Sequence, residues 1–229
     1  MSRWFPERVV LRVGDRPPAG VGTATPAAPR LESMLAAFER ELDARALKPG
    51  TRLTCVVAGD GVRYRIVPWS DELAGQAQRQ ALVEQCFHEA YGDAARAWTV
   101  RLHTRRHGAA ALACALDTLL LDRLAALART RRLELVSVQP SLMHAWNQVP
   151  RRTAPGLFWF VCIEAHATTL LLMSPTEPLH VKLLPASGIE LARTLDREWF
   201  ALGQEGPHCP LHVVRSEASA WRVVDRQAA

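Results

Sequence analysis

The sequence predicts an α/β fold, in which strands and helices alternate along the chain and pack in layers. Residues 157–163 form a continuous apolar run rich in aromatic and β-branched residues, which is typical of a strand buried on both faces. Residues 30–47 carry apolar side chains at helical spacing, and residues 62–67 alternate as a half-buried strand does. Together these patterns indicate mixed layers of helices and sheets.

The first 150 residues alternate between the two element types and are punctuated by clear boundary residues. An Asp60-Gly61 turn between two apolar runs favours a tight hairpin, Ser70 and Asp117 are suitable helix caps, and Gly92 is a suitable helix end. The expected elements are strands at 8–13, 53–57, 62–67, 98–103, 109–116 and 133–138, and helices at 30–47, 70–91, 117–129 and 141–149.

Residues 151–229 open with a predicted three-stranded meander. Its strands are expected at 157–163, 168–173 and 179–183, and Glu164-Ala165-His166 forms the first turn. A helix at 189–202 and a strand at 211–214 follow, and residues 221–224 suggest a further strand. Residues 1–29 form a separate part, because a Pro/Gly-rich linker follows their strand.

The composition indicates a globular protein, with 48% hydrophobic and 22% charged residues. The five cysteines occur singly and are odd in number, so we expect reduced thiols and a cytosol-like compartment. The net charge of +5 comes almost wholly from arginine, since Lys48 and Lys182 are the only lysines. The arginines are dispersed along the chain, so a nucleic-acid-binding module is the weakest of the three functional hypotheses; the other two are given at the end of this subsection.

Targeting signals are not expected from the sequence. The first ten residues contain no apolar core of a signal peptide. No segment approaches the roughly 18 apolar residues that a membrane-spanning helix requires. We therefore expect no direct membrane insertion.

Motifs for nucleotide binding or covalent catalysis are absent from the sequence. There is no Gly-x-x-x-x-Gly-Lys, Gly-x-Gly-x-x-Gly or Gly-x-Ser-x-Gly pattern. The glycines around Asp60 are explained by a hairpin turn. Cys162 and His166 could approach each other at a strand end, but a core thiol beside a turn histidine is the commoner explanation. Cys86 and His88 point to different faces of a helix.

A zinc site is the remaining metal hypothesis, and three residues could contribute to it. His208, Cys209 and His212 lie close together in sequence, but zinc requires four ligands and no second pair lies nearby. The sequence therefore predicts no metal centre.

The exposed face of the strand at 62–67 is a candidate surface for a partner. Arg63 and Arg65 alternate with apolar residues, and Trp69 follows the strand end as a possible aromatic anchor. The same arginines could equally form a solvated sheet face.

Three longer segments resemble the actin-like proteins of type IV pilus and type II secretion platforms, PilM and the cytoplasmic domain of GspL. LTCVVAGDGVRYRIVPWSDELAGQAQRQALVEQCFHEAYG looks like their small inserted subdomain, and AALACALDTLLLDRLAALARTRRLELVSVQPSLMHAWN looks like the end of their first half. GLFWFVCIEAHATTLLLM looks like the hairpin that opens the second half. The resemblance implies an actin-like, ribonuclease H-like fold of mixed sheets with flanking helices. Its first half would span 30–150, with the insertion at about 51–103, and a truncated second half would span 151–229.

Nucleotide-binding members of this family carry an Asp-x-Gly phosphate turn, and Glu164, Ala165 and His166 match it here. Glycine lets backbone amides approach a phosphate, whereas a histidine adds a side chain. The resemblance therefore implies a degenerate phosphate turn in a pseudo-ATPase without a cofactor.

The function expected on this basis is a non-catalytic, cytoplasmic scaffold of a type IV pilus or type II secretion-like machine. It would bind a segment of a bitopic inner-membrane protein through a groove near Arg63, Arg65 and Trp69. A divergent actin-like ATPase or sugar kinase is the enzymatic alternative.

Overall fold

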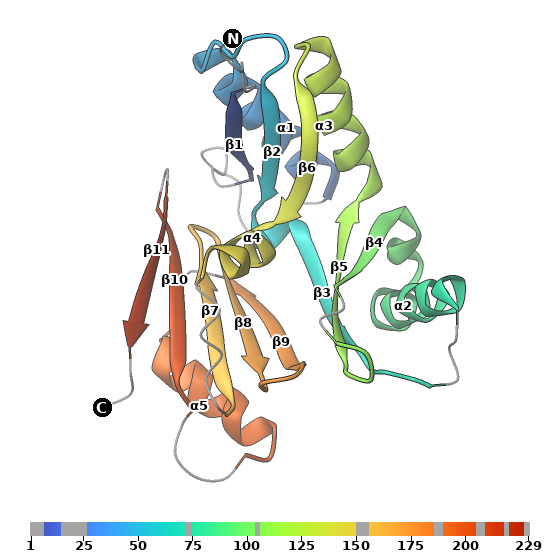
Figure 1. The fold of residues 1–229 in the computed structure, drawn as a ribbon, viewed down its shortest axis with the longest axis vertical. Helices are drawn as coiled ribbons and strands as arrows, with labels where there is room; N and C mark the ends of the chain where they lie inside the picture. Colours follow the sequence, from blue (N-terminus) through green and yellow to red (C-terminus); the bar gives the residue numbers. More distant parts are fainter. Residues whose placement is uncertain are drawn as a thin grey trace, which may run out of the picture.

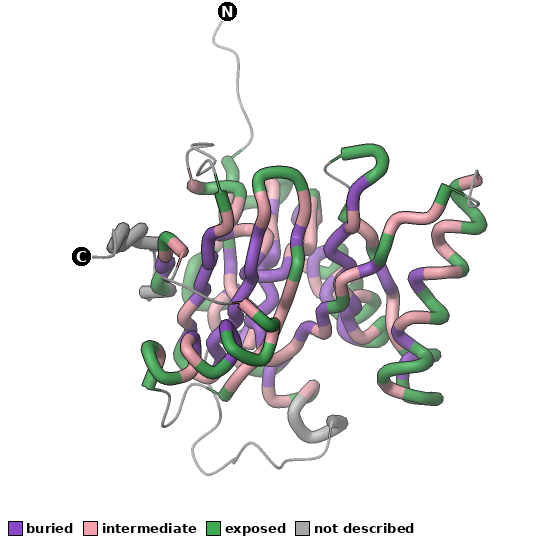
Figure 2. The backbone as a smooth tube through the Cα atoms, turned by 90° about the horizontal axis from the view of Figure 1, so that it is seen from below, coloured by how far each residue is buried: buried purple, intermediate pink, exposed green. Residues whose placement is uncertain are grey.

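The computed structural model describes residues 7–14, 27–71, 75–103, 106–149, 156–185, 190–204, 209–217 and 220–226. The strands in these ranges form three sheets, which we name A, B and C (Figure 1). The linker expected before residue 29 falls largely outside the described residues. Buried residues concentrate in the strands, and exposed residues lie in turns and on outer helix faces (Figure 2).

Sheet A is parallel and has the strand order β1-β2-β6. Its strands are β1 (Arg8–Val13), β2 (Arg52–Val57) and β6 (Glu134–Pro140). Parallel neighbours need crossover connections, and helices α1 (Ala27–Ala44) and α3 (Thr118–Thr130) provide them. The two helices contact each other, and Phe38 and Leu124 pack into the same core as Leu53 of β2.

Sheet B is antiparallel and has the strand order β3-β5-β4. It contains β3 (Val62–Val67), β4 (Trp98–His103) and β5 (Ala111–Asp117). Helix α2 (Gln76–Tyr91) packs on one face through the fully buried Val83 and Phe87, and a 3-10 segment, η2 (Gly92–Ala97), leads into β4.

The hairpin predicted around Asp60 does not form. Both edges of β2 are occupied by β1 and β6, so β3 leaves sheet A and pairs with β5 instead. Gly59–Gly61 forms a 3-10 turn, η1, between the two sheets. The inserted sheet is therefore built from residues 62–117, whereas the sequence suggested about 51–103.

Sheet C has the strand order β11-β10-β7-β8-β9. The predicted meander is confirmed as β7 (Phe158–Ile163), β8 (Ala167–Met173) and β9 (Pro178–Pro185), and β10 (Leu211–Glu217) and β11 (Ala220–Arg226) complete the sheet. Helix α5 (Leu191–Ala201) buries Leu195 and Trp199 against one face. Every residue of β8 is buried, including Thr168 and Thr169, which explains why its apolar residues do not alternate with exposed ones.

Helix α4 (Ser141–Gln148) lies between sheets A and C (Figure 1). Its Trp146 stacks on Phe158 with ring centroids 6.1 Å apart, and meets Phe160 edge-on at 5.1 Å. Leu142 and Ala145 on the same helix are fully buried. The helix thus joins the two halves of the chain through one continuous core.

Two of the three predicted helix boundary residues are confirmed. The Asp117 side chain accepts a hydrogen bond from the Leu119 amide at 2.8 Å, and Gly92 ends α2 with a φ of +63°. Ser70 is not the cap of α2, because that helix begins only at Gln76. Its first turn is held by the Gly75 amide, which donates to the Gln78 side chain at 3.1 Å.

The second half contains a buried carboxylate that is surrounded by basic side chains. The side chain of Glu198 on α5 is 5% exposed and accepts a hydrogen bond from Lys182 at 2.8 Å. Arg197 lies 3.4 Å from the same oxygen, and His180 lies 3.4 Å from the other. Burial would raise the pKa of Glu198, but Lys182, Arg197 and His180 outweigh it and lower that pKa. Burial lowers the pKa of His180, despite the attraction of Glu198.

We predict that the free energy of unfolding falls in acid, in two steps. Both pKa values are lowered on folding, so the unfolded chain binds more protons. The loss from His180 begins as the pH falls below its ordinary pKa of 6.5, and the loss from Glu198 begins below 4.5. Urea denaturation across this pH range measures both.

In Glu198→Gln, the loss of unfolding free energy that begins below pH 4.5 is expected to disappear. The loss that begins below pH 6.5 is expected to remain. Glu190→Gln is the matched control, because its side chain is 66% exposed. An unchanged acid limb in Glu198→Gln would contradict the assignment.

Among the described residues, no helix is both long enough and apolar enough to cross a membrane.

Candidate functional site

Two turns from opposite halves of the chain meet at the centre of the molecule. The turn η1 lies between sheets A and B, and Glu164 lies in the turn between β7 and β8. The Gly59 amide donates a hydrogen bond to Oε2 of Glu164 at 2.9 Å, and the Ser141 hydroxyl donates to the same oxygen at 2.8 Å. Glu164 is only 6% exposed, so this contact is buried. We name these three residues the central contact.

Local geometry positions each member of the central contact. The Glu164 amide donates to the Ala167 carbonyl at 2.8 Å, which closes the turn after β7. Ser141 is the first residue of α4, directly after Pro140 at the end of β6. Gly59 allows the close approach, because a Cβ there would lie 2.6 Å from Oε2 of Glu164. Its role is therefore to admit the carboxyl group and not to complete a hairpin.

Two buried hydroxyl groups lie near the central contact. Tyr64 of β3 is buried, and burial raises the pKa of its hydroxyl well above the ordinary value of 10.0, with further contributions from Cys114 and Glu164. The Thr169 side chain is fully buried, and its hydroxyl would lie 3.1 Å from a Cβ at Gly59. An amide and a hydroxyl that converge on one oxygen are the groups that bind an anion. Here the acceptor is the chain's own carboxyl group.

The structure separates the three residues of the turn that the family resemblance picked out. Glu164 points into the centre, whereas Ala165 is exposed and His166 is half-buried. The sequence could not identify Gly59 and Ser141 as the contacts of Glu164, since they lie 105 and 23 residues away.

A second contact joins the halves farther out. The Ala110 amide, just before β5, donates to Oε2 of Glu177 at 2.6 Å. Glu177 lies in the turn between β8 and β9. Two acidic side chains of the second half therefore bind backbone amides of the first half.

The cysteines of the described regions do not form a reactive site. Burial raises the pKa of Cys55 to about 12 and that of Cys114 to about 11, so both remain protonated thiols. Burial also raises the pKa of Cys209. Cys162 is completely buried in β7. These features favour core cysteines over nucleophiles.

No group of three or more possible metal ligands occurs in the described ranges. Of the three residues considered for zinc, His208 lies outside those ranges. The ring of His212 packs edge-on against Phe158, with centroids 5.4 Å apart.

The residues proposed for partner binding lie along β3 and beyond its end. Arg63 and Arg65 share the face of β3 that carries Val67, the face on which α2 packs. Arg63 donates to the carbonyls of Asp60 and Val62 at 3.1 Å each, and Arg65 is exposed.

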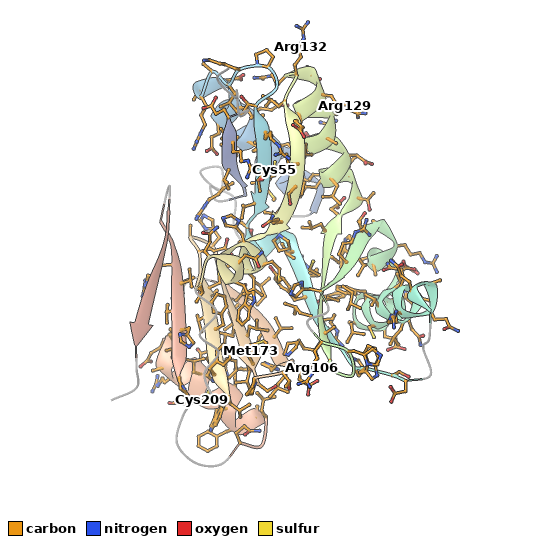
Figure 3. The ribbon with its side chains drawn as sticks, viewed as in Figure 1. Cys55, Arg106, Arg129, Arg132, Met173 and Cys209 are labelled. Atoms are coloured by element: carbon orange, nitrogen blue, oxygen red, sulfur yellow. The ribbon has the colours of Figure 1, made fainter. Side chains whose placement is uncertain are left out.

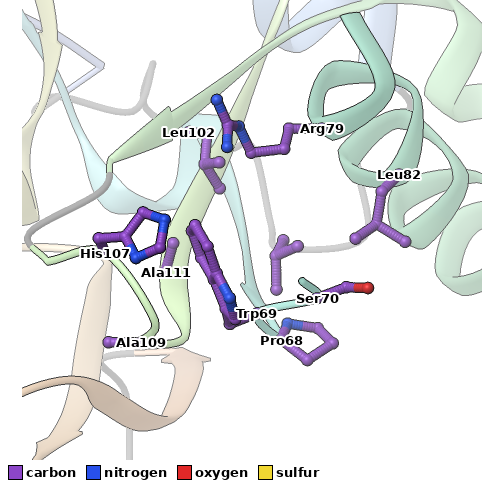
Figure 4. Close-up of a pocket in the computed structure, with 10 residues that line it drawn as sticks. Pro68, Trp69, Ser70, Arg79, Leu82, Leu102, His107, Ala109 and Ala111 are labelled. Carbon is purple, nitrogen blue, oxygen red and sulfur yellow. The ribbon is translucent and has the colours of Figure 1, made fainter. Parts of the chain in front are cut away.

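Trp69 lines a cavity of about 310 Å³ between α2 and sheet B (Figure 4). The structure adds Arg79 and His107 to this cavity, neither of which the sequence reasoning selected. Arg79 could have been noticed, because it falls on the helical stripe that continues through Leu82 and Cys86.

Three arginines of the described ranges lie in two places that are far apart. Arg129 and Arg132 lie at one end of the molecule, and Arg106 lies near the opposite end of sheet B (Figure 3). This distribution gives no support to a nucleic-acid interface.

No protein-family model and no curated protein sequence matches the chain. Solved structures do match it. The cytoplasmic domain of EpsL, an inner membrane component of the type II secretion system of Vibrio cholerae, is 15% identical, with a TM-score of 0.54 over 83% of this chain and 74% of that chain. A Bacteroides thetaiotaomicron protein with an actin-like ATPase fold is 12% identical, with a TM-score of 0.53 over 86% of this chain and 71% of that chain.

The PilM-PilN type IV pilus biogenesis complex is also similar. It is 18% identical, with a TM-score of 0.50, over 81% of this chain and 56% of that chain. The chain thus spans little more than half the length of that protein. These likenesses confirm the actin-like fold that the sequence resemblance implied.

Proposed function

We propose that this chain is a non-catalytic scaffold of a type IV pilus or type II secretion-like machine. The observation that carries the proposal is the central contact. A triphosphate held between two such turns needs free backbone amides and space for its oxygens. The Gly59 amide is already bonded to Glu164, and a Cβ added at Gly59 would lie only 2.6 Å from Oε2 of that side chain.

The scaffold would act in the cytoplasm and would reach the inner membrane through a bitopic partner. The similar structures include an inner membrane component of a secretion system and a pilus biogenesis complex, which supports this setting. The groove near Arg63, Arg65 and Trp69 is the proposed docking region, because arginines and an aromatic side chain commonly anchor interfaces.

Calorimetric titration with magnesium and ATP tests the non-catalytic part. We expect no saturable heat, because binding would require Glu164 to leave its two donors. A divergent ATPase or sugar kinase predicts the opposite result. Saturable, magnesium-dependent binding would therefore overturn the proposal.

Affinity capture from gently solubilised membranes tests the partner. We expect an identified single-span membrane protein to be retained, and Arg63→Glu to weaken its retention. Arg129→Glu is the matched control, since Arg129 lies on α3, outside sheet B (Figure 3). Equal loss with both variants would remove the docking region from the proposal.

A further inference from the structure

The cavity beside Trp69 has mainly apolar walls and is partly open. It lies where the ends of β3, β4 and β5 meet the first half of α2, and Val67, Leu82, Leu102 and Ala111 form its walls (Figure 4). Its volume of about 310 Å³ is at the lower limit of ligand pockets. It has the size for one bulky side chain or a comparably small group.

Three polar or aromatic side chains that line the cavity lie close together (Figure 4). The rings of Trp69 and His107 are in contact, with centroids 4.3 Å apart, and the Arg79 guanidinium lies 5.9 Å from the Trp69 ring. The Trp69 indole N–H donates to Asp71 at 2.8 Å, which fixes the orientation of the ring. Within the described residues, Arg79 forms no ion pair with a carboxylate. Among the described residues no carboxylate neutralises this charge, which favours an incoming anion.

Further positive charge leads from the cavity along β3. Arg65 lies two residues before Val67 on the same face of the strand, and Arg63 lies two residues before that. The charge of Arg65 acts on Cys86 of α2, where it partly offsets the burial that raises the pKa of that thiol, while Glu89 acts in the opposite sense. We name Arg63, Arg65, Trp69 and Arg79 the β3–α2 seam.

We propose that the β3–α2 seam binds an acidic segment of a partner protein, with one bulky apolar side chain seated in the cavity. This proposal rests on the proposed scaffold function and specifies the chemistry of the segment. Carboxylates pair with the fork of donors on arginine, and a flat apolar group packs on the Trp69 indole. A basic or neutral segment would leave the arginines without counter-charges.

A random peptide library displayed on phage and selected on the full chain identifies binding segments without knowledge of the natural partner. We expect the selected peptides to combine an aromatic or leucine residue with flanking Asp or Glu. Fluorescence anisotropy of one synthetic peptide from the selection then gives its dissociation constant. Affinity should weaken as the salt concentration rises.

Two variants locate the binding site. Arg79→Glu is expected to weaken peptide binding at least tenfold, about the effect of losing one charge-assisted hydrogen bond and adding repulsion. Arg101→Glu is the matched control, since Arg101 is exposed on β4 but faces the opposite side of sheet B. Trp69→Ala is the second test, because it removes the platform without changing charge. Circular dichroism of each variant verifies the fold.

Several outcomes would overturn the proposal. These are selection of neutral or basic peptides, failure to select any peptide, and equal weakening by Arg79→Glu and Arg101→Glu. Binding of small aromatic acids without binding of any peptide would indicate a metabolite pocket and would also overturn the proposal. If an identified membrane partner still binds Arg79→Glu at full strength, the β3–α2 seam is not the binding site, while the proposed scaffold function stands.

Discussion

Replacing Glu164 with alanine is expected to lower the free energy of unfolding by about 3 kcal/mol. The change leaves the Gly59 amide and the Ser141 hydroxyl without their shared acceptor, in a position where Glu164 is only 6% exposed. It also opens a small cavity between the two halves. Chemical denaturation followed by circular dichroism measures the loss.

Two comparisons make the test specific. Glu164→Gln keeps one amide oxygen that can accept from Gly59, so its loss should be smaller than that of Glu164→Ala. Glu134→Ala should change stability by less than about 0.5 kcal/mol, because its side chain is 59% exposed and pairs only loosely with Arg52, at 3.5 Å. A Glu164→Ala variant with a nearly unchanged free energy of unfolding would show that the central contact does not hold the halves together.

Replacing Gly59 with alanine is expected to destabilise the protein by about 2–3 kcal/mol. The new Cβ would lie 2.6 Å from Oε2 of Glu164 and 3.1 Å from the Thr169 hydroxyl, and both groups are buried. Gly59 has no positive φ, so the penalty is steric and not a matter of backbone strain. Gly156→Ala is the matched control: it too lacks a positive φ, and nothing lies within 4 Å of its added Cβ.

The double variant separates this steric conflict from other causes. In a Glu164→Ala background, the Cβ at position 59 occupies space that the carboxyl group has vacated. The Gly59→Ala substitution should then cost much less, with only the close contact to the Thr169 hydroxyl remaining, which gives a coupling energy of about 2 kcal/mol between the two sites. Additive losses would contradict the geometry of the central contact.

The sequence predicted those parts of the fold that depend on local patterns. The apolar runs of β7 and β8 and the Asp117 cap follow from residue types that act on their near neighbours. The prediction of a hairpin around Asp60 was wrong because it also used only near neighbours in the sequence. A turn signal cannot reveal that β1 and β6 occupy both edges of β2. Sheet membership is decided by strands far apart in sequence.

The site was predictable only in part. Glu164 stood out because it interrupts a buried run, but its partners Gly59 and Ser141 depend on how the halves pack. Trp69 was selected as an anchor, and the structure places it in a cavity with Arg79. The part that Arg63 and Arg65 play in binding stays a prediction.

The distant pairing of the strands and turns sets the order in which this molecule can fold. Strand β2 acquires its partner β6 about 80 residues later in the chain, and the hydrogen bond between Gly59 and Glu164 closes a separation of 105 residues. Proteins rich in such non-local contacts have a high contact order and fold in roughly milliseconds to seconds. During synthesis, sheet A therefore waits for β6, and the central contact waits for Glu164. Until then, the unpaired edge of β2 is exposed to other chains.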